Sequence, residues 1–558
     1  MKYAIVALTL LTFVAGAGAQ HSDAELQFIA LRDAYLAKHK PLFLKATAAK
    51  WETLRYSNDE ATARQQEAEK TLLQLVQDRR QFARLKALKE GGEVRDPVLR
   101  REMDVLYGRF LPAQVDPKLN ARIIDLETEM SQLVNTHMSR VGNRELTTTK
   151  LRELLAETKD PAEAEAAWRG YMALGKKTAP RLRELVSLRN KIARELGYAD
   201  FYHMKMALEE TDVDELLKVF DELDDLTREP YAQVKAEIDA QRAAHFGIEV
   251  SELRPWHYAD VFFQKTPPEQ EIDFDALYAG ADLEAIVRKY YANLGLSVDD
   301  VLAKSDLYDR PGKNPHGYCM NMNREGDMRV ILNLKPTVHW ANTALHELGH
   351  CVNDIYIRKD VPWVLKGPPH ALTTEGVAMM FGAMSKHEEF LTKLVGVDPA
   401  EAKRVSAAAR ESLRRERLIF ARWTQVMVRF EHAMYGNPDQ DLGKLWWELT
   451  QRYQMIDPPG TTDRPDHAVK FHILTAPAYY HSYMLGEMFA SQVRHAVAQD
   501  VLGVSDPNTT CFYDHPEIGA YLREKVFGPG DLYTWSEYVR RATGEPLTAK
   551  YLAADLKK

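Results

Sequence analysis

The stretch TVHWANTALHELGHCVNDIY, residues 337–356, is the part of this chain that decides its fold class. Its apolar residues recur at spacings of three and four, which is the period of an α-helix that buries one face. These residues are Val338, Ala341, Leu345, Leu348, Val352 and Ile355. Thr337 stands directly before the stripe, where a hydroxyl can cap the first turn. The pattern therefore predicts a helix that starts after Thr337 and is buried along one side.

His346 and His350 lie four residues apart and therefore share another face of this helix. Two imidazoles one turn apart can both reach a Zn²⁺ ion at about 2.1 Å. Glu347 lies between them, where its carboxylate can act as general base on a water that the metal activates. A His-Glu-x-x-His pattern also arises by chance, so a third ligand on a neighbouring element is needed to support this interpretation.

The stretch ALTTEGVAMMFGAM, 371–384, supplies a suitable third ligand. Thr373 or Thr374 can cap a second helix there, which places Glu375 in its first turn. A site of two histidines and one carboxylate leaves an open position for water, as catalytic zinc sites do, whereas structural zinc sites are closed and rich in cysteine. We expect one Zn²⁺ per chain, bound by the two histidines and Glu375, and metal-assisted hydrolysis of an amide bond.

The stretch KFHILTAPAYYHSY, 470–483, concentrates side chains that donate hydrogen bonds. They are Lys470, His472, Tyr479, Tyr480, His481 and Tyr483. The tetrahedral intermediate of amide hydrolysis carries an oxyanion, which needs such donors. A helix start with partly buried aromatic residues has the same composition, and only a place opposite a metal helix favours catalysis. The strand-like HGYCMN, 316–321, is a second candidate, because an extended peptide can pair with a strand edge.

Composition excludes several classes of protein. The chain has 558 residues, of which 45% are hydrophobic and 28% charged, so it can bury a large core and is not disordered, collagen-like or a coiled coil. A net charge of −8 without a basic stripe argues against nucleic acid as a partner. Three cysteines are too few for a disulfide-stapled scaffold or a four-cysteine zinc ribbon.

Helical periodicity dominates the rest of the chain. Amphipathic segments run over 24–89, break at two glycines, 91–92, and resume to about residue 244. Two β-like runs, 318–323 and 328–334, flank a turn and predict a hairpin. The pattern after this hairpin is helical again, without repeats or flexible linkers. We therefore expect a mainly-α fold rather than several separate domains.

The first 19 residues, MKYAIVALTLLTFVAGAGA, have the charged start, apolar centre and small-residue end of a secretory signal peptide. The apolar run is too short for a comfortable membrane crossing, and no later segment reaches the roughly 18 apolar residues of a membrane span. We expect residues 1–19 to be removed. The remaining chain, 20–558, is then exported to a periplasm or secreted, without membrane contact.

Several blocks of this sequence resemble the peptidyl-dipeptidase A (angiotensin-converting enzyme) family of zinc peptidases. The blocks are DPVLRRE (96–102), TALHELGH (343–350) with the later Glu375, and RYQMIDPPGTTDRPDHAVKFHI (452–473). This family is a helical ellipsoid split into two lobes by a deep central channel, with a small β-hairpin near the zinc site and N-terminal lid helices. It removes dipeptides from free C-termini. The resemblance implies one helical domain, 20–558, with lid helices within 20–110.

The resemblance also implies roles for individual residues. The family's zinc ligands match His346, His350 and Glu375, and its general base matches Glu347. The groups that stabilise the transition state match His472 and Tyr483, and those that bind substrate match His316, Lys470 and Tyr480. The tyrosine assignment assumes one inserted residue. Without it, Tyr479 and Ser482 take these two places, and a serine lacks the reach of a tyrosine.

Departures from the family pattern limit what carries over. Two arginines of chloride-sensitive members are replaced by Ser482 and Thr450, which argues against chloride activation. The glutamine that helps to hold the substrate carboxylate aligns near Tyr258, with Gln264 close by. The aspartate one turn after the glutamate ligand is here Met379, so its role is lost or comes from elsewhere.

The sequence-based hypothesis is an exported zinc-dependent peptidyl-dipeptidase, which hydrolyses short peptides near a free C-terminus by a metal-activated water. The alternative is a zinc oligopeptidase or carboxypeptidase on the same scaffold, and amidation of the substrate's C-terminus separates the two. A peptide-binding protein without catalysis is the third interpretation, against which the intact ligands and base argue.

Overall fold

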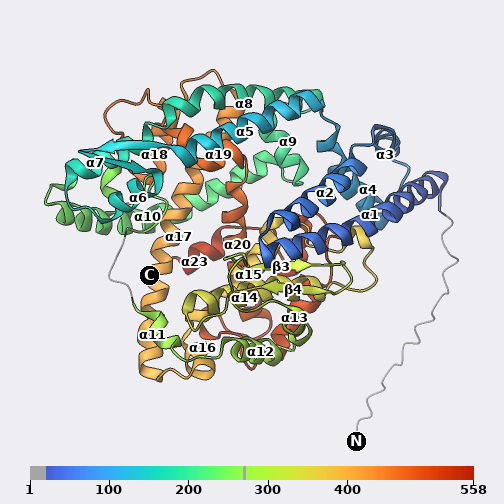
Figure 1. The fold of residues 1–558 in the computed structure, drawn as a ribbon. Coiled ribbons are helices and arrows are strands. Elements are labelled where there is room, and N and C mark those ends of the chain that lie inside the picture. Colours follow the sequence, from blue (N-terminus) through green and yellow to red (C-terminus); the bar gives the residue numbers. More distant parts are fainter. Residues whose placement is uncertain (1–20, 268–271, 558) are drawn as a thin grey trace, which may run out of the picture.

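A computed structural model describes residues 21–267 and 272–557, and it confirms the predicted mainly-α fold (Figure 1). The strands of the described residues form two separate antiparallel hairpins of two strands each. Within these ranges, no helix has the length and apolar content that a membrane crossing requires. The expected signal peptide, 1–19, lies outside the described residues.

Four helices open the described chain: α1 (Asp23–Tyr56), α2 (Asp59–Val76), α3 (Arg79–Gly91) and α4 (Pro97–Phe110). The predicted break is confirmed, since α3 ends at Gly91 and Gly92 takes a left-handed conformation with φ 65°. The carboxylate of Asp96 then caps α4 by accepting hydrogen bonds from the N–H groups of Val98 and Leu99. Local sequence signals therefore set the boundary between α3 and α4.

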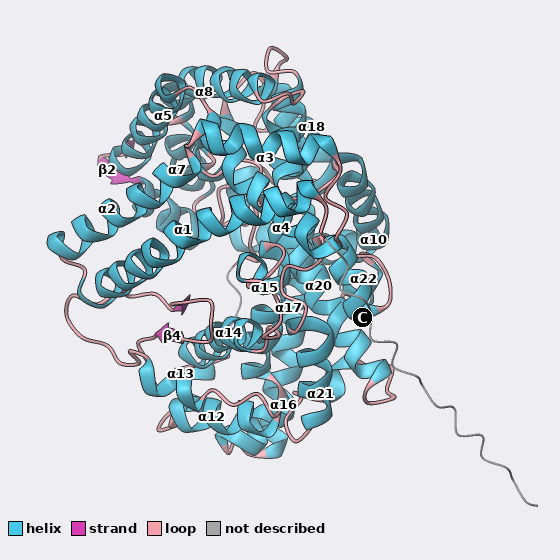
Figure 2. Ribbon diagram, turned by 90° about the vertical axis from the view of Figure 1, so that its right-hand side faces the viewer, coloured by secondary structure: helices cyan, strands magenta, loops and turns pink. Residues whose placement is uncertain are grey.

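Helices α1–α4 pack around a small apolar core of their own. It includes Phe28 and Tyr35 of α1, Leu85 of α3 and Leu106 of α4, and a distant loop closes it with Val364. These helices lie together at the right of Figure 1 and cross the face that is turned to the viewer in Figure 2. A separate core is compatible with the lid that the resemblance implies, and the lid itself stays a prediction.

The next helices form the upper part of the molecule in Figure 1. They are α5 (Pro117–Thr136), α6 (Thr148–Glu157), α7 (Pro161–Met172), α8 (Gly175–Glu195), α9 (Phe201–Leu208) and α10 (Val213–Phe246). An unpredicted hairpin, β1 (Met138–Val141) with β2 (Arg144–Thr147), interrupts them. Gly142 and Asn143 connect its strands, and Gly142 has the positive φ of 60° that such a tight turn requires. The expected helical run to residue 244 is therefore wrong at this point.

The lower part contains α11 (Phe274–Tyr278), α12 (Leu283–Asn293), α13 (Asp299–Lys304), β3 (Tyr318–Asn321), β4 (Met328–Ile331), α14 (Val338–Ile355), α15 (Ala371–Gly382) and α16 (Glu388–Phe390). The C-terminal helices are α17 (Pro399–Gly436), α18 (Leu442–Gln454), α19 (Phe471–Thr475), α20 (Tyr480–Asp500), α21 (Pro516–Tyr521), α22 (Trp535–Thr543) and α23 (Lys550–Asp555). Helix α17 links the lower to the upper part (Figure 1), and one apolar core runs through both. The deep channel between two lobes stays a prediction.

The predicted hairpin before the metal helix is confirmed as β3 and β4. Strand β3 lies along α14. The Sγ atoms of the thiols Cys319 and Cys351 are 2.7 Å apart, and Nδ2 of Asn321 donates to Oδ2 of Asp354 at 2.9 Å. Alternate residues of a strand face one side, and residues three or four apart share one side of a helix. The strand therefore follows a single face of α14.

Candidate active site

Helix α14 brings His346 and His350 together, and α15 adds Glu375 to them. The Nε2 atom of His346 is 3.7 Å from Oε2 of Glu375, and Nε2 of His350 is 3.8 Å from Oε1. The three ligand atoms lie within 4.8 Å of one another. Ligands of a tetrahedral zinc ion at about 2.1 Å are roughly 3 to 4 Å apart, so the three side chains fit a metal ion between them.

The predicted start of α14 is confirmed, because the hydroxyl of Thr337 accepts a hydrogen bond from the N–H of Trp340. Helix α14 then approaches α15 closely at Gly349. A Cβ atom at this position would lie 3.1 Å from Cα of Ala378 in α15. The small residue thus lets the two ligand-bearing helices pack at short distance.

The start of α15 differs from the prediction. Its cap is His370 rather than Thr373 or Thr374, because Nδ1 of His370 accepts the N–H of Leu372 at 3.0 Å. An imidazole lone pair thus satisfies the donor that a hydroxyl was expected to satisfy. The helix starts earlier as a result, and Glu375 lies in its second turn rather than its first.

Thr374, free of the capping role, holds the ring of His350. Its Oγ1 is 2.7 Å from Nδ1 of His350, so in the tautomer with the proton on Nδ1 this N–H donates to the hydroxyl and Nε2 keeps its lone pair toward Glu375. Burial lowers the pKa of His346 to about 4, and burial with the nearby His346 lowers the pKa of His350 to about 3. Both rings are therefore neutral at pH 7, the form that binds metals. Thr374 therefore gives the ring of His350 a hydrogen-bond partner, which the thioether of Met379, at the place of the family's aspartate, does not.

Two further clusters of metal-binding residue types occur in the described part of the chain: Glu209–His370–His481 and His387–Glu389–Cys511. In each, a histidine Nδ1 accepts a backbone N–H, from Leu372 for His370 and from Glu389 for His387. A neutral ring with its Nδ1 lone pair engaged carries its proton on Nε2. Such a ring has no lone pair for a metal in the cluster. Among the described clusters, the one on α14 and α15 fits a metal ion.

Glu347 faces the segment that leads into β3. A Cβ atom at Gly317 would lie 3.2 Å from Cγ of Glu347 and 2.5 Å from Cγ2 of Thr343, so the close approach depends on glycine. Burial raises the pKa of Glu347 to about 7, and a backbone hydrogen bond from Cys319 opposes the shift. A carboxyl group with a pKa near neutrality can both accept and return a proton, as a general base that becomes a general acid must do.

The predicted donors His472, Tyr480 and Tyr483 form one cluster at the start of α20. The ring centroid of His472 is 4.7 Å from that of Tyr480 and 6.2 Å from that of Tyr483. The buried Nδ1 of His472 has no hydrogen-bond partner among the described residues. Tyr483 is 39% exposed, and burial followed by the charge of Glu375 raises the pKa of its hydroxyl. The charge of Glu375 thus acts on the hydroxyl at the exposed end of the cluster.

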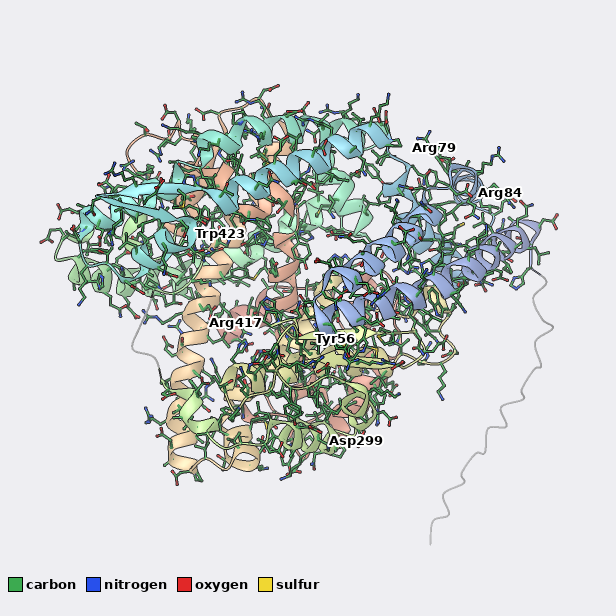
Figure 3. The ribbon with its side chains drawn as sticks, viewed as in Figure 1. Tyr56, Arg79, Arg84, Asp299, Arg417 and Trp423 are labelled. Atoms are coloured by element: carbon green, nitrogen blue, oxygen red, sulfur yellow. The ribbon has the colours of Figure 1, made fainter. Side chains whose placement is uncertain are left out.

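Lys470 lies at the far end of this cluster. Its Nζ donates to Oε1 of Gln264 at 2.7 Å, and the hydroxyl of Tyr480 donates to the same oxygen at 3.3 Å. The ammonium is within 5.1 Å of the ring centroids of Phe262, Trp423 and Tyr480. Trp423 belongs to α17 (Figure 3). Burial lowers the pKa of Lys470 to about 7. A buried ammonium among rings and an amide has the surroundings in which an added carboxylate could serve as counter-ion.

The alignment near Tyr258 is corrected by these contacts. Tyr258 instead donates from its hydroxyl to Oδ1 of Asp239 and accepts from Nζ of Lys235, both at 2.8 Å. Gln264 therefore takes the place beside Lys470. The irregular segment that carries both residues gives no periodicity from which sequence reasoning could set the register.

His316 lies at the open end of the hairpin, just before Gly317. Its side chain is exposed, and its backbone N–H donates to Oδ1 of Asn314 at 2.9 Å. Within the described residues its ring makes no hydrogen bond. The structure therefore brings the backbone beside His316 onto α14, and the substrate-binding role of the ring stays a prediction.

Comparisons with known proteins agree with this arrangement. Residues 22–253 match the angiotensin-converting enzyme family, and residues 441–558 match the carboxypeptidase Taq (M32) metallopeptidase family. The mouse angiotensin-converting enzyme-like protein Ace3 is 21% identical over 430 residues, which cover 71% of this chain and 57% of the mouse protein. This chain therefore spans little more than half the length of that relative. Helices α14 and α15 lie between the two family matches.

The helical fold, the His-Glu-x-x-His helix and the two family matches are those of a metallopeptidase. Within this class, the predicted resemblance to the angiotensin-converting enzyme family is confirmed, at low sequence identity.

Proposed function

We propose that this chain is an exported zinc peptidyl-dipeptidase, which releases dipeptides from short peptides with a free C-terminus. The observation that carries the proposal is the setting of Lys470. Its buried ammonium has an amide and three aromatic rings around it, and no carboxylate of the described chain forms an ion pair with it. Because a buried charge needs a counter-ion, this ammonium is suited to the terminal carboxylate of a substrate.

A Zn²⁺ ion bound by His346, His350 and Glu375 would act as a Lewis acid toward the scissile carbonyl and lower the pKa of a water. Glu347 takes the proton of the attacking water and returns it to the leaving amine. Tyr483, which is partly exposed and feels the charge of Glu375 in its raised pKa, donates to the developing oxyanion. His472, whose ring centroid lies 6.2 Å from that of Tyr483, is the second group that stabilises the transition state.

The order of these groups supports cleavage near a C-terminus. Lys470 contacts the ring of Tyr480, and the ring centroid of Tyr480 lies 5.5 Å from that of Tyr483. The charge of Glu375 contributes to the raised pKa of Tyr483. A carboxylate held at Lys470 therefore places the last residues of a peptide along this row, toward the metal ligands. Gln264 and Tyr480 complete the carboxylate receptor, and His316 would contact the substrate backbone from the hairpin side.

Product analysis on matched peptides tests the proposal. A decapeptide with a free C-terminus is incubated with the zinc-loaded protein, and products are identified by mass spectrometry beside the C-terminally amidated peptide. We expect sequential loss of dipeptides from the free form and at least about 100-fold slower cleavage of the amide, since an unpaired buried ammonium costs several kcal/mol. Glu347→Gln should bind zinc and lose at least about 100-fold in kcat. Equal rates on both peptides would contradict the proposal.

A carboxypeptidase on the same scaffold is the second candidate, because the carboxypeptidase Taq (M32) match, 441–558, includes Lys470 and Tyr483. The same experiment separates the two, since a carboxypeptidase releases single amino acids. An oligopeptidase would cut the amidated peptide, and a peptide-binding protein would cut neither form. We also propose that residues 1–19 direct export and that α1–α4 restrict entry to short peptides.

A further inference from the structure

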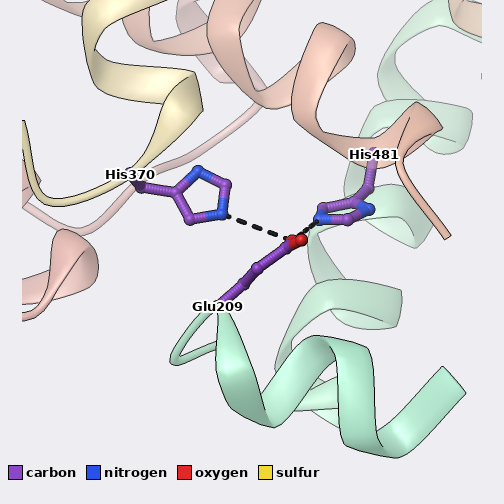
Figure 4. A group of neighbouring side chains, drawn as sticks. All are labelled: Glu209, His370 and His481. Carbon is purple, nitrogen blue, oxygen red and sulfur yellow. Dashed lines mark hydrogen bonds and ion pairs between the residues drawn. The ribbon is translucent and has the colours of Figure 1, made fainter. Parts of the chain in front are cut away.

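A partly buried carboxylate joins three helices beside the site. Glu209 follows the last residue of α9, and its Oε2 lies 2.9 Å from Nε2 of His481 in α20 and 3.5 Å from Nε2 of His370, the cap of α15 (Figure 4). His481 is 1% exposed and His370 8% exposed. Nζ of Lys205, one turn earlier in α9, is 3.4 Å from the other oxygen of Glu209.

The hydrogen-bond pattern makes this cluster a clamp on an anion. Since Nδ1 of His370 accepts the N–H of Leu372, its ring proton is on Nε2, which lies 3.5 Å from the carboxylate without meeting hydrogen-bond geometry. Nε2 of His481 lies at hydrogen-bond distance from the same oxygen. Burial alone would raise the pKa of Glu209, but the contacts with His370 and His481 outweigh it and hold the pKa well below its usual range. Glu209 is therefore a carboxylate at neutral pH.

Both histidines stand next to groups of the site. His370 precedes Thr374 and Glu375 by about one helical turn, and His481 precedes Tyr483 by two residues. Helices α15 and α20 pack closely at Gly376, where a Cβ atom would lie 2.9 Å from the carbonyl oxygen of Gly486. The helices are thus in contact beyond their first turns, and Glu209 bridges the two starts.

We propose that Glu209 is a positioning residue for the proposed peptidase reaction. Its carboxylate ties the start of α15 to the start of α20, so that Glu375 and Tyr483 keep their relative places. Loss of the carboxylate leaves Nε2 of His481 with only Oγ of Ser482, at 3.3 Å, and leaves the buried Nε2–H of His370 without an anion beside it. Both helix starts should then shift apart or toward water. A small displacement of this kind slows the chemical step more than it weakens substrate binding.

The test uses three variants of the full-length protein loaded with zinc. Glu209→Ala removes the acceptor and leaves room for a small carboxylate, whereas Glu209→Gln keeps the volume and removes the charge. Glu215→Gln, an exposed glutamate in the first turn of α10, is the matched control. For each protein we would measure zinc content, thermal unfolding, kcat and KM on a free-C-terminus peptide, and the response of kcat to added sodium formate.

We expect Glu209→Ala to keep one zinc per chain and to lose roughly 10- to 100-fold in kcat, with a much smaller change in KM. Formate should restore kcat several-fold in Glu209→Ala only, because its carboxylate can occupy the vacated place between the rings. Glu209→Gln, whose amide oxygen can still accept from the rings, should lose less kcat than Glu209→Ala and show no rescue, and Glu215→Gln should behave as the parent. A folded Glu209→Ala protein with the parent's kcat, or a kcat that formate leaves unchanged, overturns the inference.

Hydrogen exchange separates this inference from the proposed function. Amides of 371–376 and 480–485 should exchange faster in Glu209→Ala than in the parent, a result that needs no catalysis. A parent protein that cleaves no peptide contradicts the proposed function. Unchanged exchange at the starts of α15 and α20 contradicts the positioning role of Glu209. If Glu209→Ala does not fold, Glu209→Gln is measured instead: it should change exchange and kcat in the same direction but by less, because its amide oxygen keeps an acceptor, and no change in either contradicts the inference.

Discussion

At the scale of single residues, the proton on each histidine ring decides what the ring can bind. The Nδ1 of His350 faces a threonine hydroxyl and that of His370 faces a backbone N–H. A hydroxyl can accept the Nδ1 proton and leaves Nε2 free for a metal, whereas a backbone N–H can only donate and drives the proton to Nε2. The partner of Nδ1 therefore decides whether Nε2 of the ring can bind a metal, as in His350, or carries a proton toward a carboxylate, as in His370.

Lys470 predicts a pH dependence of substrate binding. Its pKa is lowered to about 7, so the free protein loses the receptor's charge as pH rises through that value. We expect kcat/KM on a free-C-terminus peptide to fall above about pH 7, and Lys470→Arg, which stays charged, to flatten that limb. Profiles of both proteins from pH 6 to about 9 check this.

The lowered pKa of Lys470 also makes the free energy of unfolding depend on pH. The unfolded chain holds the proton of Lys470 up to its ordinary pKa of 10.5, while the folded protein releases it near 7. The unfolded state binds more protons in this window, so the contribution of Lys470 makes the free energy of unfolding rise with pH there. If kcat/KM and the free energy of unfolding of the parent and of Lys470→Arg change with pH in the same way, the role given to this lysine is contradicted.

Gly317 predicts a steric effect on the hairpin. In Gly317→Ala the new Cβ would lie 2.5 Å from Cγ2 of Thr343, a branched side chain with little rotamer freedom, so β3 must move away from α14. We expect the free energy of unfolding to fall by about 1–3 kcal/mol, as overpacking does.

Thr343→Ser deletes the opposing methyl group and serves as the control for this steric effect. The double variant should regain most of the loss, and urea unfolding of all four proteins measures the coupling. A double variant no more stable than Gly317→Ala would show that the clash is not the cause.

At the scale of elements, the start of α20 is fixed from α17. Glu431 of α17 is 1% exposed, and its Oε1 accepts the N–H of Ala478 at 2.8 Å. Ala478 has φ 55°, an uncommon conformation for a residue with a Cβ atom. The buried acceptor thus holds the strained turn from which Tyr480 and Tyr483 begin their helix.

Glu431 predicts how stability depends on pH. Burial raises its pKa from 4.5 to about 7, so the folded protein binds this proton more tightly than the unfolded chain. Its contribution to the free energy of unfolding therefore falls as pH rises through that window, by about 1–3 kcal/mol. Glu431→Gln keeps an acceptor without the titration and should lack this fall. Urea unfolding at pH 5 and about 7.5 compares the two, and equal pH slopes would contradict the assignment.

At the scale of the whole molecule, helices α1–α4 are tied to the rest by a buried arginine. Arg101 of α4 is 7% exposed, pairs with Glu210 and Asp531, and donates from Nε to the carbonyl oxygen of Asp531 at 2.9 Å. Glu210 follows the clamp residue Glu209 directly. One short segment therefore contacts both the N-terminal helices and the starts of α15 and α20.

Arg101 predicts how firmly α1–α4 are held. Arg101→Ala leaves Asp531 buried without its partner, and we expect a loss of about 3 kcal/mol in the free energy of unfolding. Limited proteolysis should then cut first within 23–110. The exposed Arg100→Ala is the control. If α1–α4 form the proposed lid, Arg101→Ala should also cleave longer peptides faster, whereas a length preference identical to the parent's would argue against a lid.

Much of this molecule follows from local sequence signals. The helix that begins after Thr337, the break at Gly91 and the hairpin before α14 rest on periodicity, capping and turn residues, and the structure confirms them. The short hairpin at Gly142 escaped prediction because a two-residue turn inside helical sequence leaves a weak signal. The cap of α15 escaped because histidine is not among the usual capping residues.

By itself the sequence determined which side chains could form the site, since helical spacing alone places His346 and His350 on one face of a helix. Only the tertiary structure decided which partners complete it. Gln264 reaches Lys470 across 206 positions, and Glu209 reaches His481 across 272. Contacts over such separations depend on how helices pack, and a buried polar group takes whichever donor or acceptor the packing brings to it.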